Sequence, residues 1–204
     1  MLQEALFSEA AFGSKCGGMN PATQPKSCLR VLGVDPAASG PTGYAVLEGD
    51  ERMAHTLLFG ELRHPSRAPF GERLCELHRR MAHLLREYSP DAVALETVFA
   101  APNIRTSLKL AEARGVVLLA AAQAGVAVHS YTPREVKFQV TGYGAASKTQ
   151  IQTMVCALLK LAEPPGSHDA SDALALALCH IFTDRARRRV REAGDRLYPA
   201  RIEA

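Results

Sequence analysis

The chain has 204 residues, of which 47% are hydrophobic and 22% charged, a composition typical of one folded domain and too apolar for a disordered chain. Its 24 Lys and Arg residues against 21 Asp and Glu give a net charge of +3, which does not by itself indicate a nucleic-acid partner. Charged residues interrupt every apolar stretch before the ~20 residues that a membrane-spanning helix needs, so we expect no membrane contact.

The first part of the chain lacks a structural pattern. Residues 1–27 contain several Gly and Pro residues and no sustained period, which predicts a flexible N-terminal leader outside the fold. The compact region begins near Cys28. From there, apolar and alternating runs bounded by turn residues predict five strands, at residues 29–34, 42–47, 52–62, 91–98 and 126–131.

Helical patterns fill the segments between and after these strands. Apolar residues recur every three or four positions over residues 70–88, and Ser89-Pro90 ends this helix. A second helix covers about residues 104–124. Three further helices follow the N-cap residues Thr132, Ser147 and Ser167 and end near Val140, Ala162 and Phe182.

The order of elements predicts the fold class, which is α/β. Three closely joined strands form an antiparallel meander, and the later strands join it through right-handed strand–helix–strand crossovers. We therefore expect a mixed, five-stranded sheet with helices on both faces, and a folded domain over residues 28–183. Residues 184–204 form an Arg-rich C-terminal tail, which predicts a frayed, solvated end, with a phosphate contact as the alternative.

Cysteine usage and the N-terminal residues indicate a reducing compartment. The five cysteines are odd in number and lack C-x-x-C spacing, so a disulfide framework and a zinc site both fit poorly. Cys75, Cys156 and Cys179 lie in Leu- and Ala-rich helical patterns, which predicts small, buried, apolar side chains. The N-terminus lacks a basic start followed by an apolar core, so we expect a cytoplasmic protein.

Four acidic residues stand where structure alone does not require them. Asp35 ends the first strand, and Glu96 ends the fourth. Asp169 and Asp172 lie three apart in the first turn of an otherwise apolar helix, so they share one face. In open sheets, ligands gather at the carboxyl ends of strands, and adjacent parallel strands would bring Asp35 beside Glu96 there.

Such a carboxylate cluster predicts a divalent metal site. Two like charges ~4 Å apart cost about 4 kcal/mol at an effective dielectric of ~20, and a bound cation removes this repulsion. Oxygen ligands favour Mg²⁺, with Mn²⁺ as the alternative. A pair of such ions can activate a water and stabilise the leaving oxygen of a phosphodiester, so hydrolysis of a nucleic-acid backbone is the indicated chemistry.

Each acid also has a structural interpretation when it is taken alone. Asp35 precedes Pro36 and can be a turn residue, while Asp169 and Asp172 can complement a helix dipole. Glu96 at an apolar strand end is harder to explain in this way. His168, next to Asp169, can be a metal ligand, a neighbouring base or a solvent-exposed side chain.

A series of short stretches in chain order carries a specific resemblance. They are Val31-Leu32-Gly33-Val34-Asp35-Pro36, Thr42-Gly43-Tyr44, Leu95-Glu96-Thr97-Val98-Phe99, Ser107-Leu108-Lys109-Leu110, Ala113-Arg114-Gly115, Pro133-Arg134-Glu135-Val136-Lys137, Thr141-Gly142-Tyr143-Gly144, Ala146-Ser147-Lys148 and His168-Asp169-Ala170-Ser171-Asp172-Ala173-Leu174-Ala175. Together they span about residues 29–182 and resemble the RuvC family of Holliday-junction resolvases, which have a ribonuclease H-like fold.

The resemblance implies a Mg²⁺-dependent endonuclease that resolves four-way DNA junctions during recombination and repair by symmetric phosphodiester hydrolysis. It implies a homodimer with one site per subunit, and branch-migration proteins of the RuvA and RuvB type as partners. The family roles carry over onto these residues: the metal-binding catalytic acids onto Asp35, Glu96, Asp169 and Asp172, and the DNA contacts onto Phe99, Lys137 and Lys148.

The chain departs from the family pattern after the first strand. Ala37 follows the Asp-Pro pair where the family has Gly, and the loop over residues 38–41 is longer by one residue. Two other functions share parts of the pattern. A sugar-kinase or actin-like phosphotransferase would need a second, similar domain, for which 204 residues leave no room. A non-catalytic junction-binding protein would be expected to lose one or more of the acids, and all are present.

Overall fold

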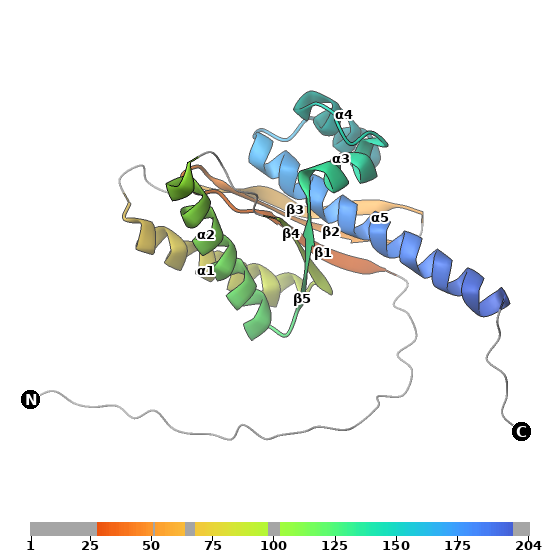
Figure 1. Cartoon of the computed structure of the whole chain (residues 1–204), viewed down its shortest axis with the longest axis horizontal. Helices are drawn as coiled ribbons and strands as arrows, with labels where there is room; N and C mark the ends of the chain where they lie inside the picture. Colours follow the sequence, from red (N-terminus) through yellow and green to blue (C-terminus); the bar gives the residue numbers. More distant parts are fainter. Residues whose placement is uncertain (1–27, 51, 64–67, 98–102, 198–204) are drawn as a thin grey trace, which may run out of the picture.

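The computed structural model describes residues 28–50, 52–63, 68–97 and 103–197. These residues form five strands and five helices. Figure 1 shows the sheet between two groups of helices, with the long helix α5 crossing one face. Within the described residues, no helix is long and apolar enough to cross a membrane.

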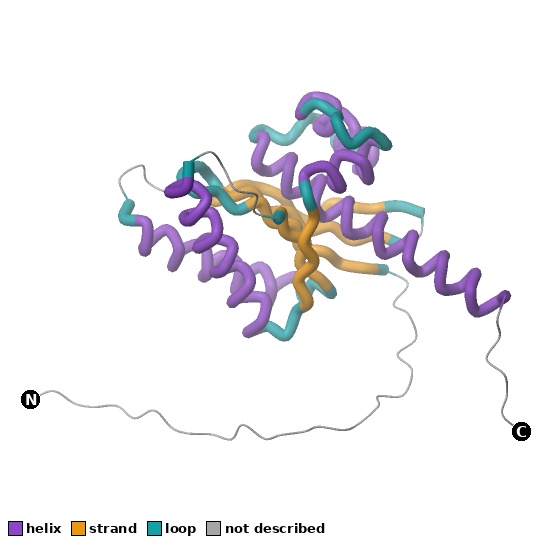
Figure 2. The backbone as a smooth tube through the Cα atoms, viewed as in Figure 1, coloured by secondary structure: helices purple, strands orange, loops and turns teal. Residues whose placement is uncertain are grey.

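The strands form one mixed sheet in the order β3-β2-β1-β4-β5. Their bounds are β1 Leu29–Asp35, β2 Thr42–Gly49, β3 Ala54–Leu62, β4 Ala92–Glu96 and β5 Ala127–Tyr131. The first three strands pair antiparallel, and β1, β4 and β5 pair parallel. Figure 2 shows the strands together in the middle of the domain, in orange, with helices on either side. The predicted meander and the two crossovers are therefore confirmed.

The helices begin where the sequence predicts. Their bounds are α1 Phe70–Tyr88, α2 Ile104–Gln123, α3 Pro133–Thr141, α4 Lys148–Leu159 and α5 His168–Leu197. Thr132 and Ser147 each form a capping box, and the Ser167 hydroxyl accepts a hydrogen bond from the Ala170 N–H. These caps satisfy N–H groups that the first helical turn leaves without partners, so they set the start of each helix.

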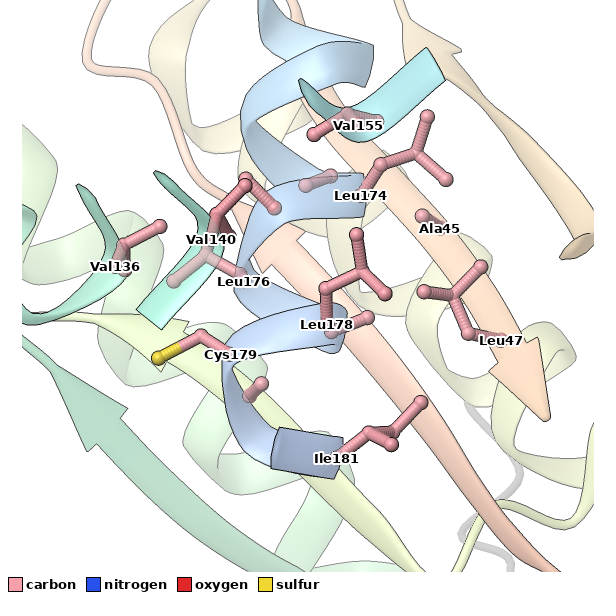
Figure 3. Packing of buried hydrophobic residues seen from close by; sticks show 14 of the residues in the cluster. Ala45, Leu47, Val136, Val140, Val155, Leu174, Leu176, Leu178, Cys179 and Ile181 are labelled. Atoms are coloured by element: carbon pink, nitrogen blue, oxygen red, sulfur yellow. The ribbon is translucent and has the colours of Figure 1, made fainter. Parts of the chain in front are cut away.

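Side chains alternate between the two faces of the sheet along each strand, and each face carries its own hydrophobic core. On β1, Val31 packs towards α3, α4 and α5, whereas Leu32 and Val34 pack towards α1 and α2. Figure 3 shows the first core, where Leu174 and Leu178 of α5 lie against the β2 side chains. Successive side chains on a strand point to opposite faces, so a residue's parity decides which helices it meets.

Two glycines let α5 approach the sheet closely. A Cβ on Gly43 would lie 1.9 Å from the Asp169 carbonyl oxygen, and one on Gly33 would lie 2.2 Å from the Ala173 carbonyl oxygen. No side chain fits into these spaces, so glycine is required at both positions. The first two turns of α5 consequently lie directly on β1 and β2.

Two predictions from the sequence are wrong. The last helix does not end at Phe182 but continues to Leu197, and Figure 1 shows it running past the ends of the strands. The Arg-rich segment is therefore helical over most of its length, because Arg and Ala are good helix formers and no Gly or Pro interrupts residues 183–193. Cys75 is exposed, whereas Cys156 is half-buried and Cys179 is buried.

Candidate active site

Asp35 and Glu96 lie at the same edge of the sheet. Their strands are parallel neighbours, and Val34 pairs with Leu95 in the register, so the next residues on each strand are Asp35 and Glu96. Both have the parity of residues that face α5. The predicted convergence at the carboxyl ends of β1 and β4 is therefore present.

The first turn of α5 brings the other two acids to this edge. The backbone of Asp169 lies against Gly43, and Gly43 pairs with Asp35 across the antiparallel ladder. Asp172 follows one turn later on the same helical face. The close contact that the glycines permit thus places Asp169 and Asp172 over the strand that ends in Asp35.

Mutual repulsion and burial act on these carboxyl groups. Burial raises the pKa of Asp35 well above its usual range, and the charges of Glu96, Asp172 and Asp169 raise it further. Burial and the charge of Asp172 raise the pKa of Glu96, which a hydrogen bond with the Asp35 side chain partly offsets. Burial also raises the pKa of Asp172, against the lowering effect of Lys148. Ionisation of these carboxyl groups is therefore unfavourable without a bound cation.

The donor chemistry suits a hard dication. All four side chains supply carboxylate oxygens, the ligands that Mg²⁺ and Mn²⁺ prefer. All four are partly buried, so water can reach them. Within the described ranges, however, no three His, Cys, Asp or Glu side chains already form a group that could hold a metal ion. Metal binding would therefore require these side chains to turn towards a common centre.

Two lysines lie at the rim of the carboxylate cluster. The Lys148 Nζ lies 3.9 Å from an Asp172 carboxylate oxygen, and its side chain remains 70% exposed. Lys137 is near enough to lower the pKa of Asp172. Lys148 is the first residue of α4, and Lys137 lies on α3, so both helices contribute positive charge beside the acids.

The remaining predicted residues differ in what the structure shows. His168 is exposed at the start of α5, and its charge lowers the pKa of Asp172. This position is compatible with each of the roles that the sequence left open. Phe99 lies outside the described residues.

The loop after Asp35 is packed despite its departure from the family pattern. Ala38 is buried, and the Ala37 N–H donates a 3.4 Å hydrogen bond to the hydroxyl of the buried Thr42. The start of this loop is therefore held against the first residue of β2.

Sequence reasoning missed one positioning residue, Arg114 of α2. Its Nε donates a 3.2 Å hydrogen bond to the Glu96 carbonyl, and its terminal nitrogen donates a 2.5 Å bond to the Ser130 hydroxyl. Arg114 thereby ties the end of β4 to β5 and holds the backbone that carries Glu96. The available signal was the Ala113-Arg114-Gly115 stretch, in which Arg114 is the last charged residue before the apolar second half of α2.

The strand order, with helices on both faces, defines a domain of the ribonuclease H-like class. The family model for "Crossover junction endodeoxyribonuclease RuvC" matches residues 31–180. The RuvC of Thermomicrobium roseum is 46% identical over 158 residues, which are 78% of this chain and 96% of the relative. That of Syntrophomonas wolfei is 41% identical over 157 residues, 77% of this chain and 91% of the relative. The chain therefore belongs to the RuvC family of crossover junction endodeoxyribonucleases.

Solved structures agree with this assignment. T. thermophilus RuvC in complex with Holliday junction substrate superposes with a TM-score of 0.73 at 34% identity, over 78% of this chain and 96% of that chain. The yeast mitochondrial Holliday junction resolvase Ydc2 has a TM-score of 0.58 at 12% identity, over 78% of this chain and 81% of that chain, and supports the fold alone. The kinase-like alternative is not supported, because the family model and the curated relatives are crossover junction endodeoxyribonucleases.

We predict that Asp35→Asn raises the melting temperature of the metal-free protein at neutral pH. A carboxyl whose folded pKa exceeds its unfolded value loses stability as pH rises through that interval, and Asn removes this loss. Each ~1 kcal/mol gained would raise the melting temperature by about 2–4 °C in a domain of this size. The melting temperature is measured by circular dichroism in EDTA, because the chain has no Trp for a fluorescence measurement.

Asp50→Asn is the matched control. Asp50 accepts hydrogen bonds from the N–H groups of Arg52 and Met53, which lower its pKa, so its charge is favourable in the folded state. The melting temperature of this variant should equal that of the parent chain or be lower. Equal or lower stability of Asp35→Asn in EDTA would contradict the repulsion described for the site.

Proposed function

We propose that the chain resolves four-way DNA junctions by metal-dependent hydrolysis of phosphodiester bonds. The observation that carries this proposal is the meeting of Asp35 and Glu96 with the first turn of α5 at one sheet edge, beside Lys137 and Lys148. An acidic cluster bordered by lysines suits a substrate that is itself anionic and is cut through a cation. The relatives with the same fold are crossover junction endodeoxyribonucleases.

Each group has a distinct role in the proposed mechanism. Asp35, Glu96, Asp169 and Asp172 would hold Mg²⁺ or Mn²⁺, which when bound activates a water and stabilises the leaving oxygen. Burial and the neighbouring carboxylates raise the pKa of Asp35, and a bound cation would oppose this effect because it favours the ionised carboxylate. Lys148 and Lys137 pair with phosphates of the bound strand and orient the scissile bond. Phe99 is proposed to stack on an unpaired base near the crossover.

We propose that two chains act together through α2. Ala113, Val117, Ala120 and Ala121 bury one side of this helix against the domain. Ile104, Leu108 and Leu119 are 73%, 57% and 53% exposed, and their spacing places them on another side. A two-fold axis through this apolar side would give two sites related by symmetry, which suits paired cuts in a four-way junction.

Two further assignments follow from this activity. Its place is the cytoplasm, where the chromosomal DNA of a bacterium lies. Branch-migration proteins of the RuvA and RuvB type would deliver the junction, as the family resemblance implies.

Cleavage of a synthetic four-way junction tests the proposed function. With Mg²⁺ or Mn²⁺ the chain should nick opposite strands and leave a matched linear duplex intact, and EDTA should abolish cutting. Asp35→Asn should reduce cleavage to background while junction binding persists, because the lost charge is a metal ligand and not a phosphate partner. Normal cleavage by this variant, or ATP turnover in place of cleavage, would contradict the proposal.

Lys148→Ala tests the phosphate contact. It should weaken junction binding and reduce the slope of log K against log salt by about one, because one fewer counterion is released. Lys160→Asn is the control: it removes an equal charge from the far end of α4, and Asn tolerates the left-handed backbone found there. Equal slopes for the two variants and the parent would show that Lys148 does not contact phosphate.

Sedimentation equilibrium tests the proposed dimer. The parent chain should have twice the 22.0 kDa chain mass at micromolar concentration. The double variant Leu108→Glu with Leu119→Glu should sediment as a monomer, because charge on the apolar side of α2 opposes its burial. Val190→Glu, at a 74% exposed apolar position on α5, is the control. A monomeric parent chain, with and without junction DNA, would contradict the dimer.

A further inference from the structure

The segment that joins α3 to α4 borders two hollows, which share one aromatic lining residue. A groove of about 800 Å³ is lined by Arg134, Phe138 and Tyr143, among others. A second hollow, of about 340 Å³, lies towards α4, and Tyr143 lines it as well. Tyr143 is therefore shared by the linings of both hollows.

Two aromatic rings are exposed at this groove. Phe138 is 59% exposed and Tyr143 is 63% exposed, although only 6% of the chain is aromatic. Neither ring is among the buried residues of the two cores, so neither is explained by packing. Planar apolar rings left in water on a polar surface indicate a binding surface for another planar group.

The backbone holds Tyr143 in a defined position. Gly142 ends α3 with a φ of 75°, a left-handed conformation that favours glycine. The Thr141 hydroxyl donates a 2.8 Å hydrogen bond to the Lys137 carbonyl and accepts a 3.2 Å bond from the Tyr143 N–H. The ring thus projects from a structured turn, and little ordering entropy would be lost when a ligand stacks on it.

Positive charge borders the same groove. The Arg134 side chain lies so close to Gly144 that a Cβ there would be 3.0 Å from the Arg134 Cγ. Glu135 also lines the groove, but its carboxylate accepts a 2.7 Å hydrogen bond from the Thr132 N–H at the N-cap of α3. Lys137, on the same helix, lies beside Asp172 of the candidate active site. Helix α3 therefore carries residues of both the groove and the candidate active site, although Lys137 itself does not line the groove.

We propose that this groove holds an unstacked nucleotide of the junction, on the strand that the neighbouring site cuts. Phe138 and Tyr143 stack on its base, and Arg134 pairs with its phosphate. A nucleotide fits the observations because it combines a planar ring with an adjacent negative charge, and the groove offers planar rings beside a guanidinium. The inference rests on the proposed junction-cutting function and adds a second aromatic contact, separate from Phe99.

Salt-dependent binding to a four-way junction separates stacking from charge pairing. In an Asp35→Asn background, Phe138→Ala and Tyr143→Ala should each weaken binding by about fivefold or more, with an unchanged salt slope, since no counterion is involved. Arg134→Ala should weaken binding and reduce the slope by about one. Val190→Ala, which removes an exposed apolar side chain from the distant part of α5, should change neither quantity.

The fluorescence of 2-aminopurine, placed at successive positions near the cut, locates the stacked base. One position should be quenched by the parent protein and by Val190→Ala, but not by Phe138→Ala or Tyr143→Ala. Parental affinity and quenching in both aromatic variants would overturn the proposal. A halved mass of these variants in sedimentation would also overturn it, because the groove would then hold a second chain. Failure of the proposed function gives a different result: the parent chain itself would cut no four-way junction. That outcome does not depend on the aromatic variants.

Discussion

The close contact between α5 and the sheet is the constraint on which the site depends. Gly33 and Gly43 leave no room for a Cβ, so the helix backbone lies on β1 and β2 and its first turn covers the end of β1. Acids more than 130 residues apart in the chain, Asp35 and Asp169, become neighbours through this contact. Bulkier residues at these glycines would lift the helix and separate its carboxylates from those on the strands.

The two cores stabilise an arrangement that the site itself opposes. Burial raises the pKa of Asp35, and repulsion by the neighbouring carboxylates raises it further. Leu174 and Leu178 anchor α5 on one face of the sheet, while Met81 and Leu84 bury the other face under α1. Apolar burial on both faces thereby offsets the cost of holding like charges together, and a bound cation would remove that cost.

Basic and aromatic groups extend the site along α3 and α4. Lys137 and Lys148 border the acids, and α3, which carries Lys137, also lines the groove beside Tyr143. A substrate that spans both regions would be held by charge near the cut and by stacking farther along the strand. Affinity and chemistry would then depend on different side chains of the same short segment.

Local sequence patterns determined most of the elements and the positions of the four acids. Apolar periodicity placed α1 at Phe70–Tyr88, and N-cap residues placed the starts of α3, α4 and α5. The same reasoning ended α5 too early, because it treated dense charge as a stop although Arg favours helix. The sequence also predicted that Asp35 and Glu96 meet, but only the tertiary structure shows that Arg114 holds the backbone of Glu96 and that Tyr143 lines two hollows. These features arise from contacts between residues distant in the chain, which no local period or propensity encodes.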